Sequence, residues 1–357
     1  MVLVLSNDDV ASVLTMPACM EAIEDAYREQ AAGRAVNQLR YDTRMPLPER
    51  QERDSDYEFK TMVGIIPKMG IAALRMSSTL NFHPLIDGVE RSERLYLAPG
   101  GTTVGMVQLY SVETGEPLAF MPDGVLQGTR VGATYGIAAK HLARADATVM
   151  GLLGSGWQAR FQVAATAQAR PLQRVKVYSP NREHREQFAK EIGALYDLDV
   201  EAVESADEAA RDVDILVAAT NSRGPLIPRA FVKPGMHIAA VQNELAEDAY
   251  PAADLMVVAS DARYLMYMGG GGAGQYGKQL GRERSAARES TSRVLIEDVV
   301  AGKAPGRTRP DEITMFRSDS GMGIQFAAAG AVVYQEARKR GLGHEIPTDW
   351  FTQSLHT

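Results

Sequence analysis

The segment Val149-Met-Gly-Leu-Leu-Gly-Ser-Gly-Trp-Gln-Ala159 decides the fold of this chain. An apolar run leads into Gly154-x-Gly156-x-x-Ala159, and a helical pattern follows. In such a turn the first glycine permits the tight bend, the second lets the backbone approach a diphosphate, and the small last residue lets the helix pack closely on the strand. The diphosphate then lies at the helix N-terminus, where free N–H groups favour an anion. The segment therefore predicts a dinucleotide site that contains Gly154, Ser155, Gly156, Trp157, Gln158 and Ala159.

Further apolar runs predict that this unit belongs to an α/β domain with a doubly wound parallel sheet of the Rossmann type. The runs cover residues 174–179, 214–220, 236–241 and 254–260, and helix-like stretches separate them. Their near-continuous hydrophobicity is typical of strands covered on both faces. Thr220, Asn221 and Val241, at the ends of two runs, are further candidate cofactor contacts.

The rest of the chain predicts a discontinuous, β-rich α+β domain. A helix is expected between Thr15 and Gly33, and strands are expected at 61–67, 71–80, 104–112 and 117–121, with 113–116 as the turn of a hairpin. A long helix is expected over 323–340. We expect residues 1–130 to form the first part of a substrate and dimerisation domain, 131–315 the dinucleotide domain, and 316–357 a C-terminal segment whose helix returns to the first domain.

Composition excludes several classes of protein. The chain has 357 residues, a net charge of −7 and no Lys/Arg-rich run, which argues against a nucleic-acid partner. No apolar stretch approaches the roughly 20 residues that span a bilayer, and the N-terminus lacks a signal-like pattern, so we expect a cytoplasmic protein. The single Cys19 falls in a helical apolar pattern and is expected to be a buried structural thiol. The six scattered histidines predict no metal site.

Several segments in order along the chain resemble the ornithine cyclodeaminase/mu-crystallin family. They are 36–40, Arg75 in Ala72-Ala-Leu-Arg-Met-Ser77, 113–119, Gly128-Thr-Arg-Val-Gly-Ala133, 154–159, 233–241 and 311–316. The Gln158-Ala159 ending and the Thr129-Arg130 pair are the most specific parts. The resemblance implies a homodimer that uses a nicotinamide cofactor, without a metal, for amino-acid cyclodeamination, amino-acid dehydrogenation or imine reduction.

The resemblance also implies that Arg40, Arg75 and Arg130 gather around a substrate carboxylate. A planar guanidinium can hold a carboxylate through two parallel charge-assisted hydrogen bonds, which fixes its orientation for hydride transfer. Each of the three could instead be a solvated surface arginine, and Arg44 lies close enough to Arg40 in the chain to take its place.

Two departures from the family pattern affect the chemistry. The family has a lysine at the place of Arg75, and arginine, with a pKa above about 12, keeps the charge but cannot donate a proton. The family's catalytic aspartate follows the strand at 236–241, where Glu244 is the nearest acid here and is either a longer-armed replacement or an exposed loop residue. Lys60, His83 and Tyr96 are the other candidate proton donors.

The end of the second strand predicts the cofactor type. Ser179, Asn181 and Arg182 suit the 2′-phosphate of NADP(H), and no carboxylate stands at the position that holds the 2′-hydroxyl in NAD enzymes. These residues could equally be a turn, a helix cap and a surface arginine, which leaves NAD(H) as the alternative.

Two segments have no assigned role. Residues 268–274 are rich in glycine but lack the P-loop pattern and suggest a loop or lid, and residues 317–321 suggest either a cover over the active site or a hinge.

Together these features predict an enzyme that uses NADPH to reduce the C=N bond of a small imino acid, with Arg75 and Arg130 holding the carboxylate and Glu244 as a catalytic candidate. One alternative is an NAD-dependent cyclodeaminase, which regenerates its cofactor in each turnover and so consumes no NADPH. Another is a non-catalytic protein that binds NADPH or a small ligand. The sequence does not specify which side chain the substrate carries.

Overall fold

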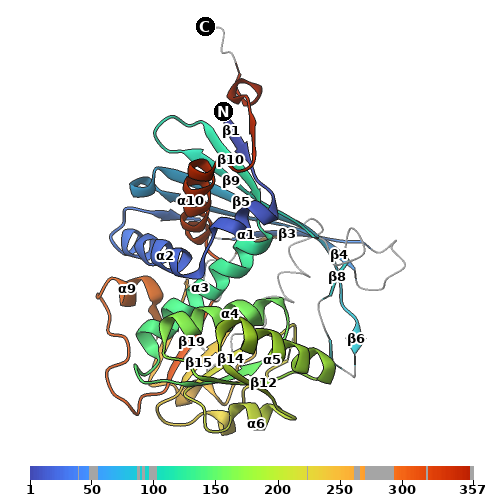
Figure 1. The fold of residues 1–357 in the computed structure, drawn as a ribbon, viewed down its shortest axis with the longest axis vertical. Helices are drawn as coiled ribbons and strands as arrows, with labels where there is room; N and C mark the ends of the chain where they lie inside the picture. The colour runs from blue at the N-terminus through green and yellow to red at the C-terminus, as the bar shows by residue number, and fades with distance from the viewer. Residues whose placement is uncertain are drawn as a thin grey trace.

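The Gly154–Ala159 segment lies between β11 (Val149–Leu153) and α4 (Trp157–Ala169), as the sequence predicts. We describe the chain from a computed structural model, which covers residues 1–38, 40–47, 55–86, 89–90, 93–95, 103–222, 224–260, 266–269, 293–318 and 321–353. Figure 1 shows two sheets stacked along the long axis, with the dinucleotide unit in the lower half. No helix in the described ranges is long and apolar enough to cross a membrane.

The lower sheet is parallel throughout its described strands and has the order β13-β12-β11-β14-β15-β19-β16-β18. Besides β11, its strands are β12 (Arg174–Tyr178), β13 (Asp199–Ala202), β14 (Ile215–Ala218), β15 (His237–Ala240), β16 (Leu255–Val258), β18 (Arg293–Leu295) and β19 (Thr314–Arg317). Its helices and 3-10 turns are α4, α5 (Arg182–Tyr196), α6 (Ala206–Ala210), α9 (Ile296–Val300), η2 (Arg229–Phe231) and η3 (Tyr250–Ala252). The chain runs outward from β11 to β13 and then restarts at β14 on the other side, which creates the switch point where such sheets bind dinucleotides. The predicted Rossmann-type α/β fold is confirmed.

The upper sheet is mixed and has the order β17-β3-β4-β5-β9-β10-β1-β20, with β2 paired to β4 and β8 to β5. Its strands are β1 (Val2–Val4), β2 (Val36–Asn37), β3 (Tyr41–Pro46), β4 (Asp56–Ile66), β5 (Ile71–Phe82), β8 (Glu93–Leu95), β9 (Val104–Ser111), β10 (Pro117–Pro122), β17 (Met266–Gly269) and β20 (His344–Ile346). A separate pair consists of β6 (Leu85–Ile86) and β7 (Val89–Glu90). The predicted hairpin is formed by β9 and β10.

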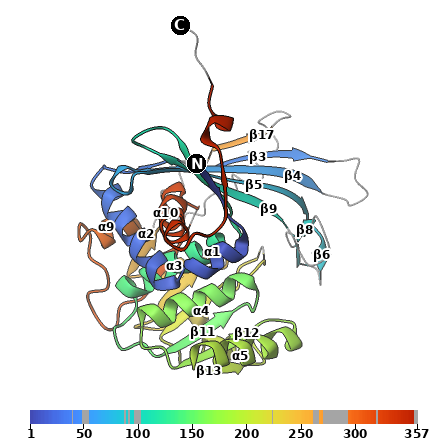
Figure 2. The ribbon, with the colours of Figure 1, turned by 45° about the horizontal axis from the view of Figure 1, so that its top comes forward.

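Helices cover one face of this upper sheet, on the side toward the dinucleotide domain, and the described residues place no helix over the other face (Figure 2). The helices and 3-10 turns of this part are α1 (Asn7–Val13), α2 (Met16–Ala31), α3 (Gly124–Leu142), α10 (Gly323–Arg340), η1 (Pro67–Met69) and η5 (Thr348–Phe351). α10 packs against α2, β4 and β5, and β20 pairs with β1, so both ends of the chain belong to this layer. α3 also packs against α4, and the boundary expected at residue 130 falls inside this continuous helix. β17 hydrogen-bonds to β3, although it lies in the stretch expected to be dinucleotide domain.

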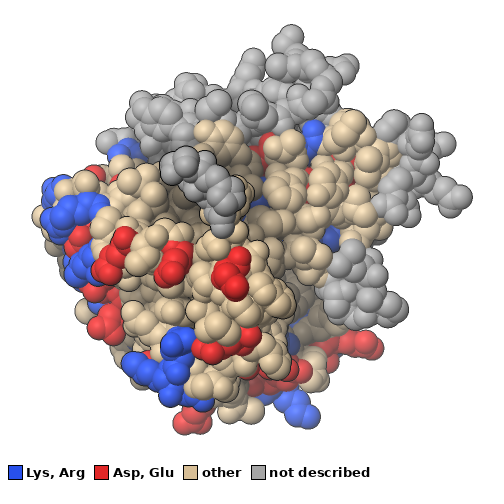
Figure 3. Space-filling model, turned by 90° about the horizontal axis from the view of Figure 1, so that it is seen from above, with Lys and Arg blue, Asp and Glu red and all other residues tan. Residues whose placement is uncertain are grey.

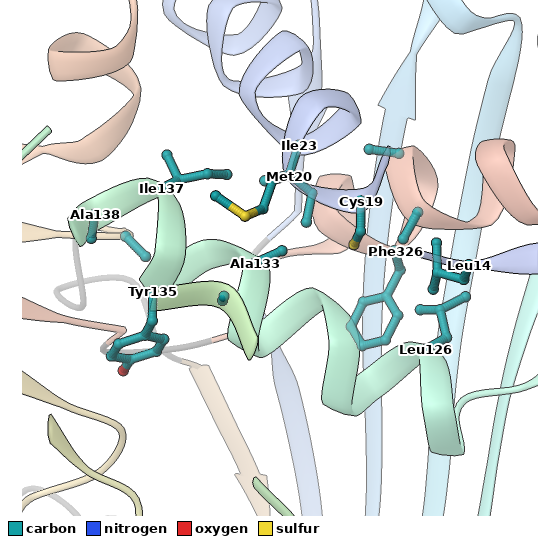
Figure 4. Packing of buried hydrophobic residues seen from close by; sticks show 14 of the residues in the cluster. Leu14, Cys19, Met20, Ile23, Leu126, Ala133, Tyr135, Ile137, Ala138 and Phe326 are labelled. Carbon is teal, nitrogen blue, oxygen red and sulfur yellow. The ribbon is translucent and has the colours of Figure 1, made fainter. Parts of the chain in front are cut away.

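The core under the upper sheet is built from α2, α3 and α10. Figure 4 shows Cys19 and Met20 of α2 near Ala133 of α3, with Phe326 of α10 near Leu126. Cys19 is fully buried, and burial raises the pKa of its thiol to about 12, which confirms the expected structural role. Because α3 contacts both this core and α4, it carries side chains from the upper layer directly to the dinucleotide edge.

The exposed surface mixes the two signs of charge. In the view from above, basic and acidic side chains form small interspersed groups, and no continuous basic area appears among the described residues on this face (Figure 3). This pattern fits the net charge of −7.

Candidate active site

The turn after β11 has the geometry that a dinucleotide diphosphate requires. Gly154 has φ +109, and a Cβ at this position would lie 2.3 Å from the carbonyl oxygen of Ala219, so only glycine fits. Gly156 immediately precedes α4, and no atom lies within 4 Å of the place where its Cβ would be. The open backbone at the start of a 13-residue helix suits an anion. Ala159 is fully buried, which permits the close helix packing expected from the motif.

The remaining residues of the motif frame this turn. Trp157 is exposed and stacks edge-on against Phe161, with 5.0 Å between ring centroids. The side-chain amide of Gln158 donates to the carbonyl of Gly128 in α3 at 3.4 Å. The Ser155 hydroxyl lies 2.8 Å from the Ser179 hydroxyl at the end of β12, so the turn and the second strand are directly joined.

The end of β12 presents the residues that we expected to contact an adenosine 2′-phosphate. Asn181 caps α5, because its side-chain oxygen accepts a hydrogen bond from the backbone N–H of His184 at 3.0 Å. The Arg182 side chain is 69% exposed and forms an ion pair with Glu186 at 2.7 Å. Asn181 thus has a capping role already, whereas Arg182 is tied only to surface carboxylates and is free to turn toward a ligand.

The candidates at the carboxyl ends of β14 and β15 are gathered at the same edge. The backbone N–H of Val241 donates to the carbonyl of Ala218 at 3.0 Å, and Thr220 lies two residues after the end of β14. The Asn221 side chain donates to Glu93 of β8 at 3.2 Å. A strand of the upper sheet therefore reaches the edge where the cofactor candidates lie.

Glu244 also lies at this edge, but its carboxylate is occupied by backbone. Its oxygens accept hydrogen bonds from the N–H of Thr220 at 3.3 Å and the N–H of Gln242 at 2.5 Å, and the residue is fully buried. Burial raises the pKa of this carboxyl, and these backbone donors oppose the rise. Glu244 therefore links the chain beyond the end of β14 to the chain beyond the end of β15. Of the two alternatives that the sequence allowed, the exposed loop residue is wrong, because Glu244 is buried.

Arg75 and Arg130 are brought together, as expected, although they come from β5 and α3. Both guanidinium groups lie over the ring of Phe326 in α10, with the central carbon 5.5 Å from the ring centroid for Arg75 and 4.5 Å for Arg130. Both residues are buried. Two cations at one aromatic ring in a buried site form a strong attractor for an anion.

The two arginines differ in their partners. Arg75 binds Asp123, the residue before α3, through Nε at 2.8 Å and Nη2 at 2.6 Å. Asp123 fits there only because residue 105 on β9 is glycine, since a Cβ at Gly105 would lie 2.0 Å from the carboxylate. Arg75 is therefore already neutralised by a carboxylate of the chain itself.

Arg130, in contrast, has only neutral hydrogen-bond partners in the described part of the chain. It donates to the side-chain oxygen of Gln325 at 2.8 Å and to that of Gln127 at 2.7 Å. Burial lowers the pKa of Arg130 well below its usual range, and the nearby positive charge of Arg75 lowers it further. A buried cation without a bound carboxylate is the condition in which a substrate carboxylate gains most from binding.

A second group of charges continues along the same face of the upper sheet. Alternation places Arg75, Ser77 and Thr79 of β5 on the helix-covered face, and the register places Lys60 of β4 opposite Ser77 and Glu58 opposite Thr79. Glu58 is buried and binds both Arg44 of β3 and Lys60, the latter at 2.5 Å.

Arg40 and Arg44 both belong to this group. Arg40 binds Asp42 through two hydrogen bonds of 2.8 and 2.6 Å, and it lies near enough to Arg130 to contribute to that group's lowered pKa. Arg44 is held by Glu58, farther along the strand. Arg40 is therefore among the charges that act on Arg130.

The other candidate donors are less well placed. His83 lies 2.9 Å from Asp56 near the end of β5, and Tyr96 lies outside the described residues. No cluster of three or more potential metal ligands occurs in the described ranges. Of the glycine-rich segment, residues 268 and 269 belong to β17 and 270–274 lie outside the described residues.

The segment at 317–321 is described only at its ends. The Arg317 side chain is buried and binds Asn243 at 3.1 Å, whereas a Cβ at Gly321 would lie 3.2 Å from Nη2 of Arg130. This segment therefore connects the dinucleotide sheet to the arginine site.

Sequence reasoning missed the partners that organise the site, namely Asp123, Gln127, Gln325, Phe326 and Glu58. Asp123 could have been noticed in the sequence for one reason. It stands just before the helix that contains Arg130 and precedes that arginine by seven residues, which is two helical turns along the same face. Gln127 lies one helical turn before Arg130, its partner, and Glu58 lies two residues before Lys60, but neither spacing by itself marks a site. Gln325 and Phe326 leave no local signal, because the arginines that they contact are distant in the chain.

The fold and the site define an oxidoreductase of the Rossmann type with a buried arginine site beside its dinucleotide edge. The chain belongs to the ornithine cyclodeaminase/mu-crystallin family, whose model matches residues 2–341. It is 32% identical to an alanine dehydrogenase of Archaeoglobus fulgidus over 351 residues, which cover 96% of this chain and 98% of that protein. It is 30% identical to a Δ1-pyrroline-2-carboxylate reductase of Bacillus cereus, with 69% of this chain and 74% of that protein covered.

Solved structures agree with this assignment. The structure of Thermococcus litoralis Δ1-pyrroline-2-carboxylate reductase in complex with NADH and L-proline superposes with a TM-score of 0.78 at 25% identity, covering 96% of this chain and all of that one. An archaeal alanine dehydrogenase dimer with bound NAD gives a TM-score of 0.75 at 28% identity, covering 97% and 99%. The chain is thus an NAD(P)-dependent oxidoreductase that acts on C–N bonds, which confirms the class predicted from the sequence.

Proposed function

We propose that this protein reduces the C=N bond of a small imino acid with NADPH, and that Arg130 anchors the substrate carboxylate. The observation that carries this proposal is the buried Arg130 guanidinium, which has neutral glutamine partners and no carboxylate partner among the described residues. Imine reductases and an amino-acid dehydrogenase among the relatives support the reaction class.

The residues of the chain divide the work as follows. When bound, the nicotinamide supplies the hydride. Arg130 holds the carboxylate, and Arg75, which Asp123 fixes in place, offers further N–H donors beside the Phe326 ring. Burial of both arginines excludes water from the carboxylate and strengthens its attraction to them. Gln127 and Gln325 orient the Arg130 fork before substrate arrives, which lowers the ordering cost of binding.

We further propose that NADP(H) is preferred over NAD(H). Ser179 and Asn181 end β12 without a carboxylate, and the exposed Arg182 next to them can reach a 2′-phosphate by exchanging its surface ion pair. The exposed carboxylates of Glu186 and Glu204 that now pair with Arg182 are solvated, and a phosphate can form two parallel charge-assisted hydrogen bonds with the guanidinium.

The direct test is a panel of imines assayed for NADPH oxidation at 340 nm. The panel should contain Δ1-pyrroline-2-carboxylate, iminosuccinate and pyruvate with ammonia. We expect stoichiometric oxidation of NADPH with at least one of them. Conversion of ornithine without net NADPH consumption would identify a cyclodeaminase, and tight NADPH binding without turnover of any imine would identify a binding protein.

We also propose that the protein is a homodimer that buries the outer face of the upper sheet. On this face β4 and β5 present half-buried Phe59, Val63, Leu74 and Leu80, and no described helix covers them (Figure 2). An apolar sheet face of this kind needs a partner. Light scattering should give about twice the chain mass of 38.8 kDa. A monomer at all concentrations would reject this arrangement.

A further inference from the structure

Reduction of a C=N bond requires a proton at nitrogen as well as a hydride at carbon. In the proposed arrangement Arg75 is bound to Asp123 and Arg130 holds the substrate carboxylate, so neither guanidinium is assigned as the donor of that proton. Glu244 is fully buried, and its carboxylate oxygens already accept hydrogen bonds from two backbone N–H groups. Among the described residues, the remaining candidates are Lys60 of β4 and His83, which follows β5.

Distance along the strands separates the remaining candidates. Lys60 stands opposite Ser77, two residues from Arg75 on β5, which corresponds to about 7 Å at 3.3 Å per residue. His83 is eight residues from Arg75, roughly 26 Å at the same rise, and is bound to Asp56. A small imino acid held at Arg130 and Arg75 can reach the first position and not the second.

Lys60 also shares its charged surroundings with the arginine site. Arg40 lies near enough to both Lys60 and Arg130 to act electrostatically on each. Glu58 binds the Lys60 ammonium at 2.5 Å and is itself held by Arg44, which fixes the direction of the lysine side chain.

We propose that Lys60 is the catalytic acid that protonates the imine nitrogen, an assignment that rests on the proposed imine reduction. The ammonium N–H bond breaks as a proton moves to the substrate nitrogen, while the hydride of the reduced nicotinamide forms the new C–H bond. The imine becomes an amine, the nicotinamide is oxidised, and the neutral Lys60 amine then takes a proton from solvent.

The electrostatics suit this task. Burial lowers the pKa of Lys60 below its ordinary value, and the positive charge of Arg40 acts in the same direction. The carboxylates of Glu58 and Asp42 oppose this shift. Arg44 and Arg75 are neutralised by Glu58 and Asp123, so they add little net charge at this position. A lysine with a lowered pKa gives up its proton more readily than one in water.

The test compares Lys60→Met, Lys60→Arg and Lys60→Ala with wild type, using Δ1-pyrroline-2-carboxylate and NADPH over pH 6 to 10.5. We expect kcat/KM of Lys60→Met to fall about 10²- to 10⁴-fold, the range that general acids contribute. Its alkaline limb should disappear, because that limb reports loss of the Lys60 proton. Lys60→Arg should be equally impaired although it retains the charge. Methylamine should partly restore Lys60→Ala.

The matched control is Lys68→Met, which removes an exposed lysine of η1 near Glu29 and should leave activity unchanged. Loss of Lys60 leaves Glu58 paired with Arg44, so the variants should fold, and circular dichroism with NADPH titration verifies this.

An unchanged kcat with an unchanged alkaline limb in Lys60→Met would overturn the assignment. A rise in KM alone, or full activity in Lys60→Arg, would overturn it as well, since either result means that the lysine only binds substrate. A wild-type enzyme that reduces none of the imines would instead refute the proposed function, and the assignment of Lys60 would fall with it.

Discussion

Replacement of Arg130 by lysine tests the proposed carboxylate anchor most directly. The substitution retains a positive charge but loses the planar fork that can hold a carboxylate through two parallel bonds. Hydrogen bonds to charged groups contribute about 1.5 to 3 kcal/mol, so loss of one of the two should cost that amount in binding. This corresponds to a fall in kcat/KM of about 10- to 150-fold.

The assay should pair the mutation with a change in the substrate. Wild type and Arg130→Lys are compared on Δ1-pyrroline-2-carboxylate and on 1-pyrroline, which lacks the carboxylate. We expect the full loss on the first substrate and less than about a threefold change on the second, since an interaction absent from the substrate cannot be lost. The difference between the two ratios measures the coupling between Arg130 and the carboxylate.

Stability provides a separate readout. Lysine lacks the planar fork through which Arg130 now reaches both Gln127 and Gln325, and loss of one of these hydrogen bonds is expected to cost about 1 to 3 kcal/mol in thermal unfolding. Arg28→Lys on the exposed side of α2 is the control, and it should change neither quantity. Equal losses on both pyrrolines would refute the reasoning, because they would show that Arg130 supports the fold and does not bind the carboxylate.

Three further predictions concern the cofactor, Arg75 and pH. Arg182→Ala should weaken NADPH binding about tenfold or more and barely change NADH binding in fluorescence titration. The control is Arg211→Ala, which removes a similarly exposed arginine with an i,i+4 ion pair and should alter the binding of neither cofactor. Equal losses for both cofactors would reject the 2′-phosphate contact. Arg75→Lys should lower kcat/KM by a factor equivalent to about 2 to 3 kcal/mol of transition-state binding without moving the pH profile, because Asp123 loses its two-bond partner. An unchanged or higher kcat/KM would mean that Arg75 does not help to hold the carboxylate. Burial raises the pKa of Glu297 in α9 to about 7, so the folded state binds this proton more tightly than the unfolded state, and the resulting stability is lost as pH rises from about 4.5 through 7. The free energy of unfolding of Glu297→Gln should therefore exceed that of wild type by about 1 to 3 kcal/mol at pH 8, and the two should be alike at pH 4. Glu21→Gln, at an exposed position, is the control. A stability difference that does not depend on pH would contradict this prediction.

Local sequence determined the elements whose geometry depends on near neighbours. The Gly154–Ala159 turn, the hairpin of β9 and β10 and the bounds of α10 were all predictable, since turn and helix signals act over a few residues. The candidates Gly154, Gly156 and Ala159 belong to one such local unit, and the structure gives them the conformation and burial that the motif requires.

Only the tertiary structure decided how the charged residues are used. Arg75 and Asp123 are 48 positions apart, and Arg130 and Gln325 are 195 apart, so neither pair leaves a pattern in any short window of sequence. The same applies to Glu244, whose role depends on the backbone N–H of Thr220 beyond the end of β14, and to Lys60, whose place near Arg75 follows from the register of β4 against β5. An arginine, lysine or glutamate looks alike in sequence whether solvated or buried. The chemistry of such a side chain depends on its charged partner and on how far it is removed from water. Both are set by chain segments that meet only in the folded state.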